Sequence, residues 1–393
     1  MNGPLEKYAP LFGKTGTWCT VLADAGTGTV VSQESVDVRP AQVADALRAA
    51  GAEDADARAA EEALRPEEGL PSPVARLLLV RNGTVELDRV LPGERVENPY
   101  ISVGVIPDLL PLVRHEGSDL PVITANVDRS GADIVLSYAR PGMEGRQATE
   151  EHTTEGSTEN LKKVPGGGWA QGKYQHRTEE IWRQNADEVA GEIDRLVEAR
   201  RPALVAIGGD QRARDLVFSQ LSDHSRAIAA TVDSHTRAAG ADPEVMTAAV
   251  ERLLAEKQAH AQHQLLERLE QEKDHPNPRA VFGIGAVVRA LQQAQVETLV
   301  LSDQLAPDPG AGNTATDQGG RQTRELVVLD EAPWIAAAED EVAGARVLGR
   351  AAAAAALLRA AVLTDATVEL LPAAAIPGGA EAAAVLRWGA GQA

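Results

Sequence analysis

The chain is poor in several residue types that particular classes of protein require. Its 393 residues include a single cysteine, Cys19, which excludes a disulfide framework and a cysteine-rich zinc site. Aromatic residues make up 3% of the chain, so the cores must be built mainly from Ala, Val and Leu. It has no apolar run of about 18 residues, as a membrane-spanning helix needs. The start, MNGPLEKYAP, has no apolar signal region. We therefore expect a cytoplasmic protein with no membrane partner.

Positive charge is also scarce. Lys and Arg number 38 against 58 Asp and Glu, which gives a net charge of -20. Broad nucleic-acid binding draws its affinity from clustered cations that displace counterions, so we expect no DNA partner. One segment departs from this balance. Between Asn160 and Thr178 there is no acid, and the bases are Lys162, Lys163, Lys173 and Arg177. A local contact with RNA therefore stays open.

The order of the secondary-structure signals predicts a multi-domain α/β protein. We divide it into an N-terminal α+β domain (1–120), a middle α/β domain (121–237) and a C-terminal α/β sandwich (243–393). In the N-terminal domain we expect a strand at 18–25 and a hairpin at 75–92. Asn82-Gly83 lies between the two apolar runs of that hairpin, and this pair favours a type I′ turn.

The middle domain opens with a predicted strand hairpin at 122–138. A polar, Gly-rich stretch follows, and its composition favours a mobile loop at 140–177. Apolar residues at helical spacing predict a helix at 178–200. Residues 203–221 are typical of a strand, a Gly-Gly turn and a helix, and 227–234 of a further strand.

The C-terminal domain begins with a long predicted helix at 243–273. A helix and a strand are expected within 285–302, and a Pro/Gly/Asn/Thr linker at 307–323. A strand at 325–330 and an Ala-rich helix at 338–362 follow, and two strands complete the domain.

Several polar groups have a structural and a functional interpretation. Gly208-Gly209-Asp210-Gln211 follows a strand and precedes a helix, where an anion can bind. Neither a GxGxxG nor a GxxxxGK[ST] pattern is present, so a turn capped by Asp210 is favoured. Asp128, Asp133 and Asp233 could gather around Mg²⁺ as in an RNase H-like nuclease. Ordinary turn chemistry is the favoured interpretation, and we expect no metal.

The histidines and the acidic stretch favour structural interpretations. His260 and His263 are spaced i, i+3 on a helix without further patterned ligands, which indicates a solvated face. His235 follows Asp233-Ser234, but no GxSxG elbow supports a hydrolytic set. The acidic stretch Glu53–Glu68 is typical of a solvated helix face.

The stretch KVPGGGWAQGKYQHR at 163–177 is the main candidate site. Glycines let a backbone approach a ligand closely, bases meet phosphates, and aromatic rings stack on nucleobases. The alternative is a solvated linker that happens to be basic. The candidate RNA-binding residues are Lys162, Lys163, Gly166, Gly167, Gly168, Trp169, Gln171, Lys173, Tyr174 and Arg177.

In their order, these pieces resemble the class-I release factors of archaea and eukaryotes, which include the ribosome-rescue factor Pelota. The resemblance covers roughly residues 121–393, through NVDRSGADIVL, GGGWAQGKYQHRTEEIW, ALVAIGGDQRARDLV and AATVDS. Within that superfamily the chain is similar to the bacterial release-factor-like proteins of actinobacteria, including Balon-like ribosome hibernation factors. The resemblance implies an RNase H-like middle domain and a C-terminal domain like a kink-turn-binding ribosomal protein.

The sequence departs from the family at the loop tip. There the family's glutamine directly follows two glycines, whereas Trp169 and Ala170 here separate Gly168 from Gln171. Two inserted residues shift the tip by several Å, and a misplacement of about 1 Å can cost about a hundredfold in rate. The resemblance then implies that release chemistry is lost or altered.

The resemblance thus implies a ribosome hibernation or stress factor without cofactor. It would occupy the A site of the 70S ribosome, with its loop at the peptidyl-transferase centre and a translational GTPase as a candidate partner. Stop-codon reading is not expected, because the Asn-Ile-Lys-Ser and Tyr-x-Cys motifs are missing. One alternative is an enzyme, a peptidyl-tRNA hydrolase or tRNA-cleaving rescue factor that uses Gln171. Another is an acidic interaction protein that does not bind the ribosome.

Overall fold

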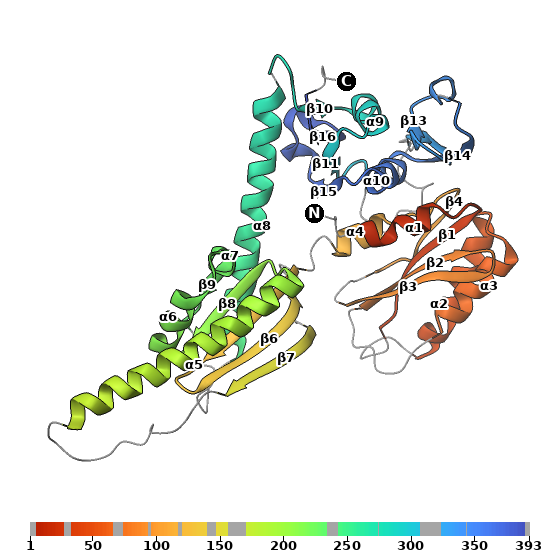
Figure 1. The fold of residues 1–393 in the computed structure, drawn as a ribbon. Coiled ribbons are helices and arrows are strands. Elements are labelled where there is room, and N and C mark those ends of the chain that lie inside the picture. Colours follow the sequence, from red (N-terminus) through yellow and green to blue (C-terminus); the bar gives the residue numbers. More distant parts are fainter. Residues whose placement is uncertain are drawn as a thin grey trace. The chain divides into compact units, whose positions relative to one another are not determined.

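The chain folds into two compact units in a computed structural model (Figure 1). One unit comprises residues 1–117 together with 262–393, and the other comprises 118–261. The structure describes residues 5–26, 33–65, 74–92, 96–116, 120–139, 147–155, 170–233, 243–273, 275–306, 324–342 and 344–389. Within these ranges, no helix is both long enough and apolar enough to cross a membrane. The predicted multi-domain α/β fold is confirmed, whereas the three domain boundaries stay a prediction.

The first unit contains an antiparallel sheet near the N-terminus. Its strands lie in the order β3-β2-β1-β4, with bounds β1 (Trp18–Asp24), β2 (Val74–Arg81), β3 (Thr84–Pro92) and β4 (Tyr100–Gly104). Side chains alternate between its faces, as the two-residue period of a strand requires. Cys19 and Val21 pack toward helices α2 (Gln33–Ala49) and α3 (Asp54–Ala63). Asn82 and Gly83 both have positive φ, 52° and 70°, as the predicted type I′ turn requires.

The opposite face of this sheet belongs to a larger core. Trp18, Leu22 and Leu77 are buried there, together with residues of α1 (Ala9–Phe12) and α4 (Leu110–Glu116). The same cluster includes the buried side chains of α9 (Ile284–Gln292) and α10 (Ala353–Leu363). The two ends of the chain therefore share one core in this unit.

The C-terminal part of the first unit has two sheets. The larger has the order β10-β16-β11-β15, with bounds β10 (Ala280–Phe282), β11 (Val296–Ser302), β15 (Thr367–Leu371) and β16 (Ala382–Leu386). The smaller has the order β13-β12-β14, with bounds β12 (Glu325–Leu329), β13 (Ile335–Ala336) and β14 (Val347–Ala352). Short 3-10 turns complete the unit: η1 (Glu6–Tyr8), η3 (Glu339–Glu341), η4 (Ala373–Ala375) and η5 (Pro377–Gly379).

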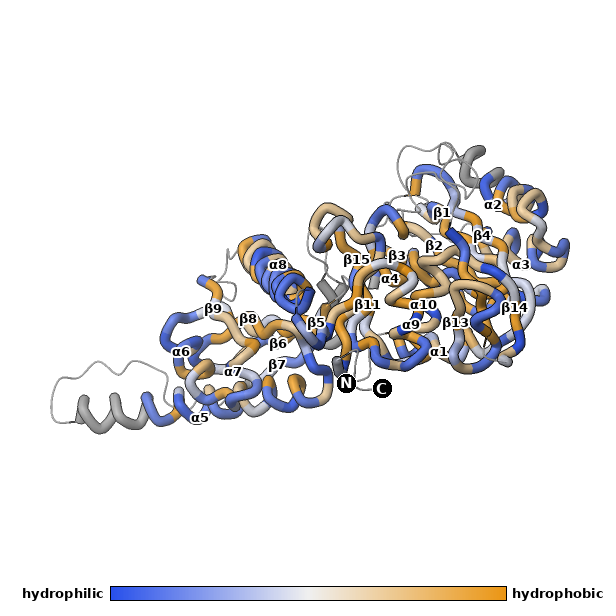
Figure 2. The backbone as a smooth tube through the Cα atoms, turned by 90° about the horizontal axis from the view of Figure 1, so that it is seen from above, coloured by the Kyte–Doolittle hydropathy of each residue, from blue (hydrophilic) through white to orange (hydrophobic). Residues whose placement is uncertain are grey.

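The second unit is a five-stranded sheet between helices. Its order is β7-β6-β5-β8-β9, with bounds β5 (Leu120–Val127), β6 (Gly131–Ala139), β7 (Gln147–Glu155), β8 (Leu204–Gly209) and β9 (Ala229–Thr231). One face is covered by α5 (Ala170–Arg200), α6 (Gln211–Gln220) and α7 (Asp223–Ile228). The first half of α8 (Pro243–Lys273) covers the other, through Met246, Val250 and Leu254. Figure 2 shows apolar central strands, and helices α5 and α8 on which polar and apolar residues alternate.

Several local predictions differ from the structure. Residues 147–155 form the edge strand β7 instead of a loop, and α5 begins at Ala170 instead of 178. The sequence QATEEHTTE is polar on both faces, so it lacks the apolar alternation that signals a strand. Residues 223–228 are helix α7, which Ser222 caps, so only 229–231 are strand.

The predicted helix at 338–362 is helical only from Ala353. Residues 347–352 form β14 and pair with β12, although this segment contains two alanines. Alanine favours a helix by less than about 1 kcal/mol over most residues, and sheet pairing overrides such a preference.

Candidate nucleic-acid interface

The predicted RNA-binding residues precede α5 or lie on its first turns. Six of them are outside the described residues: Lys162, Lys163, Gly166, Gly167, Gly168 and Trp169. The other four belong to α5, with side chains outside the described part: Gln171, Lys173, Tyr174 and Arg177. The interface is therefore a prediction for these positions, and the described residues show what supports α5 beside them.

The turn between β5 and β6 is closed by its own aspartate. Asp128 Oδ1 accepts hydrogen bonds from the backbone N–H of Ser130 (2.7 Å) and Gly131 (3.0 Å), and from Ser130 Oγ (2.6 Å). The backbone N–H of Asp128 donates to Gly131 O (2.9 Å). These bonds are those of an Asx turn, which the local sequence predicts. They fix the backbone of Arg129, at the apex of the turn.

Arg129 joins this turn to helix α5. Asn185 is 3% exposed, and its Nδ2 donates to the backbone carbonyl of Arg129 (3.0 Å). The Arg129 guanidinium lies 4.6 Å from the centre of the Trp182 ring, within the range of a cation–π contact. Its Nη2 also contacts Asp210 Oδ2 at 3.3 Å. One residue of the turn is thus held by α5 through both its backbone and its side chain.

The Gly-Gly-Asp segment after β8 lies beside the same turn. Asp210 caps α6, since its Oδ1 accepts from the backbone N–H of Ala213 (3.1 Å). Gly209 has a φ of +112°, and a Cβ at this position would lie 1.9 Å from Val127 O. The favoured interpretation, a structural turn capped by Asp210, is confirmed. Glycine is needed because strand β5 passes too close for a side chain.

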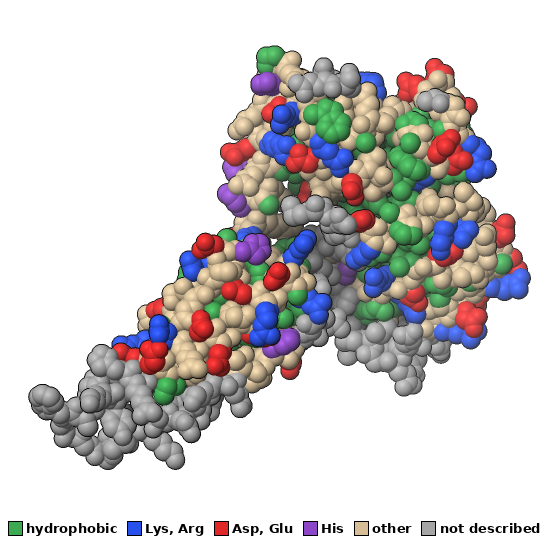
Figure 3. Space-filling model, viewed as in Figure 1, with side chains coloured by type: hydrophobic (Ala, Val, Ile, Leu, Met, Phe, Trp, Pro, Cys, Tyr) green, Lys and Arg blue, Asp and Glu red, His purple; other side chains and the backbone are tan. Residues whose placement is uncertain are grey.

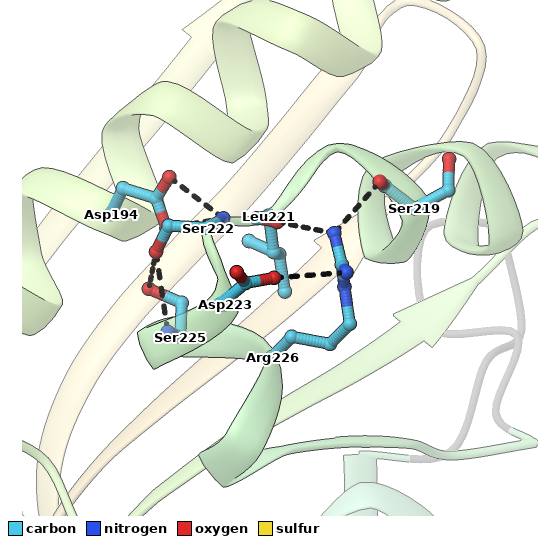
Figure 4. A network of polar contacts seen from close by, with 7 residues as sticks. All are labelled: Asp194, Ser219, Leu221, Ser222, Asp223, Ser225 and Arg226. Carbon is cyan, nitrogen blue, oxygen red and sulfur yellow. Dashed lines mark hydrogen bonds and ion pairs between the residues drawn. The ribbon is translucent and has the colours of Figure 1, made fainter.

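A second polar network fixes the C-terminal half of α5 (Figure 4). Asp194 accepts from the backbone N–H of Ser222 (3.1 Å) and from Ser222 Oγ (2.9 Å). Arg226 donates to the carbonyls of Leu221 (2.6 Å) and Ser219 (3.0 Å). Because the network joins α5 to the segment between α6 and α7, the long helix is held at two separate places.

A protein-family model matches the part of the chain that contains these contacts. Residues 121–275 match the model of the bacterial archaeo-eukaryotic release factor family 2. We call residues 121–275 the release-factor segment. The release-factor segment contains the β5–β6 turn, α5 and the Gly-Gly turn after β8.

Relatives of most of the chain are known from sequence. An uncharacterized protein of Mycobacterium tuberculosis H37Rv is 24% identical over 304 residues, which are 76% of this chain and 78% of the relative. The protein of the strain CDC 1551 matches with the same values.

The chain is also similar to two proteins of known structure. Ribosome-bound archaeal Pelota, in a structure that also contains ABCE1, is 12% identical with a TM-score of 0.42, covering 99% of this chain and 96% of that one. The Saccharomyces cerevisiae factor Dom34 is 7% identical with a TM-score of 0.39, covering 80% of each chain.

The three aspartates considered as Mg²⁺ ligands lie in the second unit, where each has a partner or position that does not require a metal ion. Asp128 closes its own turn, and Asp133 lies opposite Asn126 in the β5–β6 pair. Asp233 pairs with Arg214 (2.7 Å) while its side chain stays exposed. Among the described residues, no group of three His, Cys, Asp or Glu could hold a metal ion.

The remaining candidates from the sequence are the histidines and the acidic stretch that contains α3. His263 lies on an exposed part of α8 and pairs with Glu267 (3.3 Å), and His260 is also exposed. His235 lies outside the described residues. The acidic helix α3 has an exposed face that includes Asp54 and Glu62, but Asp56 is 1% exposed and accepts from the backbone N–H of Gly83 (2.5 Å). Burial raises the pKa of the Cys19 thiol to about 12, which keeps it protonated.

Arg129, Trp182 and Asn185 are not among the residues expected from the sequence. Their only sequence signals are a base within the turn Asp-Arg-Ser-Gly and a tryptophan on a polar helix. The contact joins positions 53 and 56 residues apart, because residue 129 meets 182 and 185. Figure 3 shows acids and bases interspersed over the described part of the face in view.

Proposed function

We propose that the chain is a cytoplasmic ribosome-binding factor of the hibernation or stress type. The release-factor segment would carry residues 162–177 into the RNA-walled peptidyl-transferase region, with the protein in the A site of the 70S ribosome. The observation that carries the proposal is the family match over residues 121–275. The segment that it contains between Asn160 and Thr178 has four bases and no acid on a chain of net charge -20. A translational GTPase is a further candidate partner.

Sedimentation of the purified protein with empty 70S ribosomes tests this proposal. We expect the wild-type protein to co-sediment with the ribosomes. The double change Lys173→Glu/Arg177→Glu should abolish this binding at moderate salt, because contacts with RNA phosphates require the positive charges. The matched control is Arg195→Glu/Arg252→Glu, which reverses the same number of charges at exposed sites of the same unit. Absence of wild-type binding at low salt would reject the proposal.

The enzymatic alternative rests on Gln171, which belongs to the first turn of α5. If the factor cleaves peptidyl-tRNA or tRNA on stalled ribosomes, Gln171→Ala should remove cleavage while 70S binding persists. Wild type that binds stalled ribosomes and leaves their tRNA intact would leave the non-enzymatic proposal standing.

A further inference from the structure

Arg129 is held in place before any ligand binds. Its backbone is fixed by the Asp128 turn and by Asn185, and its guanidinium lies against Trp182 at 4.6 Å. An exposed arginine normally loses rotamer entropy when a ligand immobilises it. Stacking on a ring removes part of this cost in advance, so Arg129 is prepared for a contact.

The hydrogen-bonding capacity of Arg129 is mostly unused. A guanidinium has five N–H donors, and in the described part of the chain one of its nitrogens, Nη2, reaches Asp210 at 3.3 Å. Asp210 uses its other oxygen to cap α6. By contrast, Arg76 makes two bonds to Asp88, of 2.8 and 2.7 Å. The Arg129 side chain is 49% exposed, so part of its surface is accessible to solvent.

The Arg129 guanidinium lies beside α5, the helix that carries part of the predicted RNA-binding segment. Trp182 follows Arg177 by five residues on α5, which is about 7.5 Å along a helix axis. Ala170, the first residue of α5, is about 18 Å from Trp182 by the same rise. An RNA strand that runs along the first turns of α5 would therefore reach Trp182 and Arg129 within a few nucleotides.

We propose that Arg129, held over the Trp182 ring, receives an unpaired RNA base on the guanidinium face that points away from the ring. Proteins bind splayed-out bases by stacking them on aromatic rings or on arginine guanidinium planes, and the free N–H donors can bond a neighbouring phosphate. Trp182 and Asn185 act as positioning residues. The inference rests on the proposed ribosome binding and names the ligand at one contact, a single-stranded base of rRNA or tRNA.

The test combines binding with base-specific chemical probing of 70S ribosomes. Arg129→Ala retains the backbone carbonyl that Asn185 holds and the Asp128 turn, so the variant should fold, as its melting temperature would verify. We expect its 70S affinity to fall roughly 5- to 100-fold, the loss of one stacked base. One or two unpaired bases that wild type protects should become reactive. Arg129→Lys, which keeps the charge without the plane, should recover little of this protection.

The control is Arg195→Ala on α5, an exposed arginine about 20 Å from Trp182 along the helix axis. It should leave both the affinity and the protection pattern unchanged. Wild-type binding with Arg129→Ala equal to the control would overturn this inference and keep the proposed function. A loss of affinity without any change in base reactivity would indicate a protein contact and would also overturn it. No binding by wild type would reject both.

Discussion

At the scale of single residues, close backbone approach decides which side chains the release-factor segment tolerates. Gly209 ends β8 with a φ of +112°, directly against β5. The backbone N–H of Asp210 donates to Val127 O (3.0 Å), and this bond draws the two chain segments together. A Cβ on residue 209 would meet backbone atoms that cannot move aside.

Gly209→Ala should therefore destabilise the protein by more than about 1 kcal/mol, since alanine is strained at positive φ and clashes here. Gly191 is the control, because it lies on an exposed part of α5 with no atom within 4 Å of an added Cβ. Gly191→Ala should stabilise by about 0.5–1 kcal/mol through helix propensity. Urea denaturation measures both. Equal effects of the two changes would contradict the close approach of β5 and β8.

At the scale of elements, one buried carboxylate ties α3 to the β2–β3 hairpin. Asp56 is 1% exposed, and it accepts from the N–H of Gly83 at the tip of the hairpin turn. Asp54, two residues earlier, is exposed and pairs with Arg58 and Arg48. The same helix thus carries one buried and one solvated aspartate.

Asp56→Ala should cost about 1.5–3 kcal/mol of unfolding free energy, because it removes the hydrogen bond between the buried carboxylate and the backbone N–H of Gly83. Asp54→Ala should change the denaturation midpoint little, since exposed ion pairs contribute little to stability. If both variants unfolded at the wild-type midpoint, the tie between α3 and the hairpin would have no energetic role.

At the scale of the whole molecule, the two units differ in how the chain supplies their cores. Residues 118–261 are continuous, and they bury Ile123, Val189 and Ile193 on one face of their sheet and Met246 and Val250 on the other. The first unit needs both ends of the chain, because α4 and α10 contribute to one core.

A fragment of residues 118–261 should accordingly unfold in one cooperative transition, whereas residues 1–117 alone should expose apolar surface and aggregate or bind a hydrophobic dye. Circular dichroism melts and dye fluorescence of the two fragments give the comparison. A fragment 1–117 that melts cooperatively on its own would show that the shared core is dispensable.

Local sequence patterns were enough to locate those strands, turns and caps that are encoded within a few neighbouring residues. Apolar runs placed β1, β2, β5 and β8, and Asn82-Gly83 and Asp210 placed a turn and a cap, since strand period and turn chemistry act over a few residues. By contrast, the strand at 347–352, the strand at 147–155 and the meeting of Arg129 with Trp182 became apparent only in the folded chain. Each depends on a partner that is not its neighbour in sequence, whose pairing or packing energy exceeds the weak local preference of the segment.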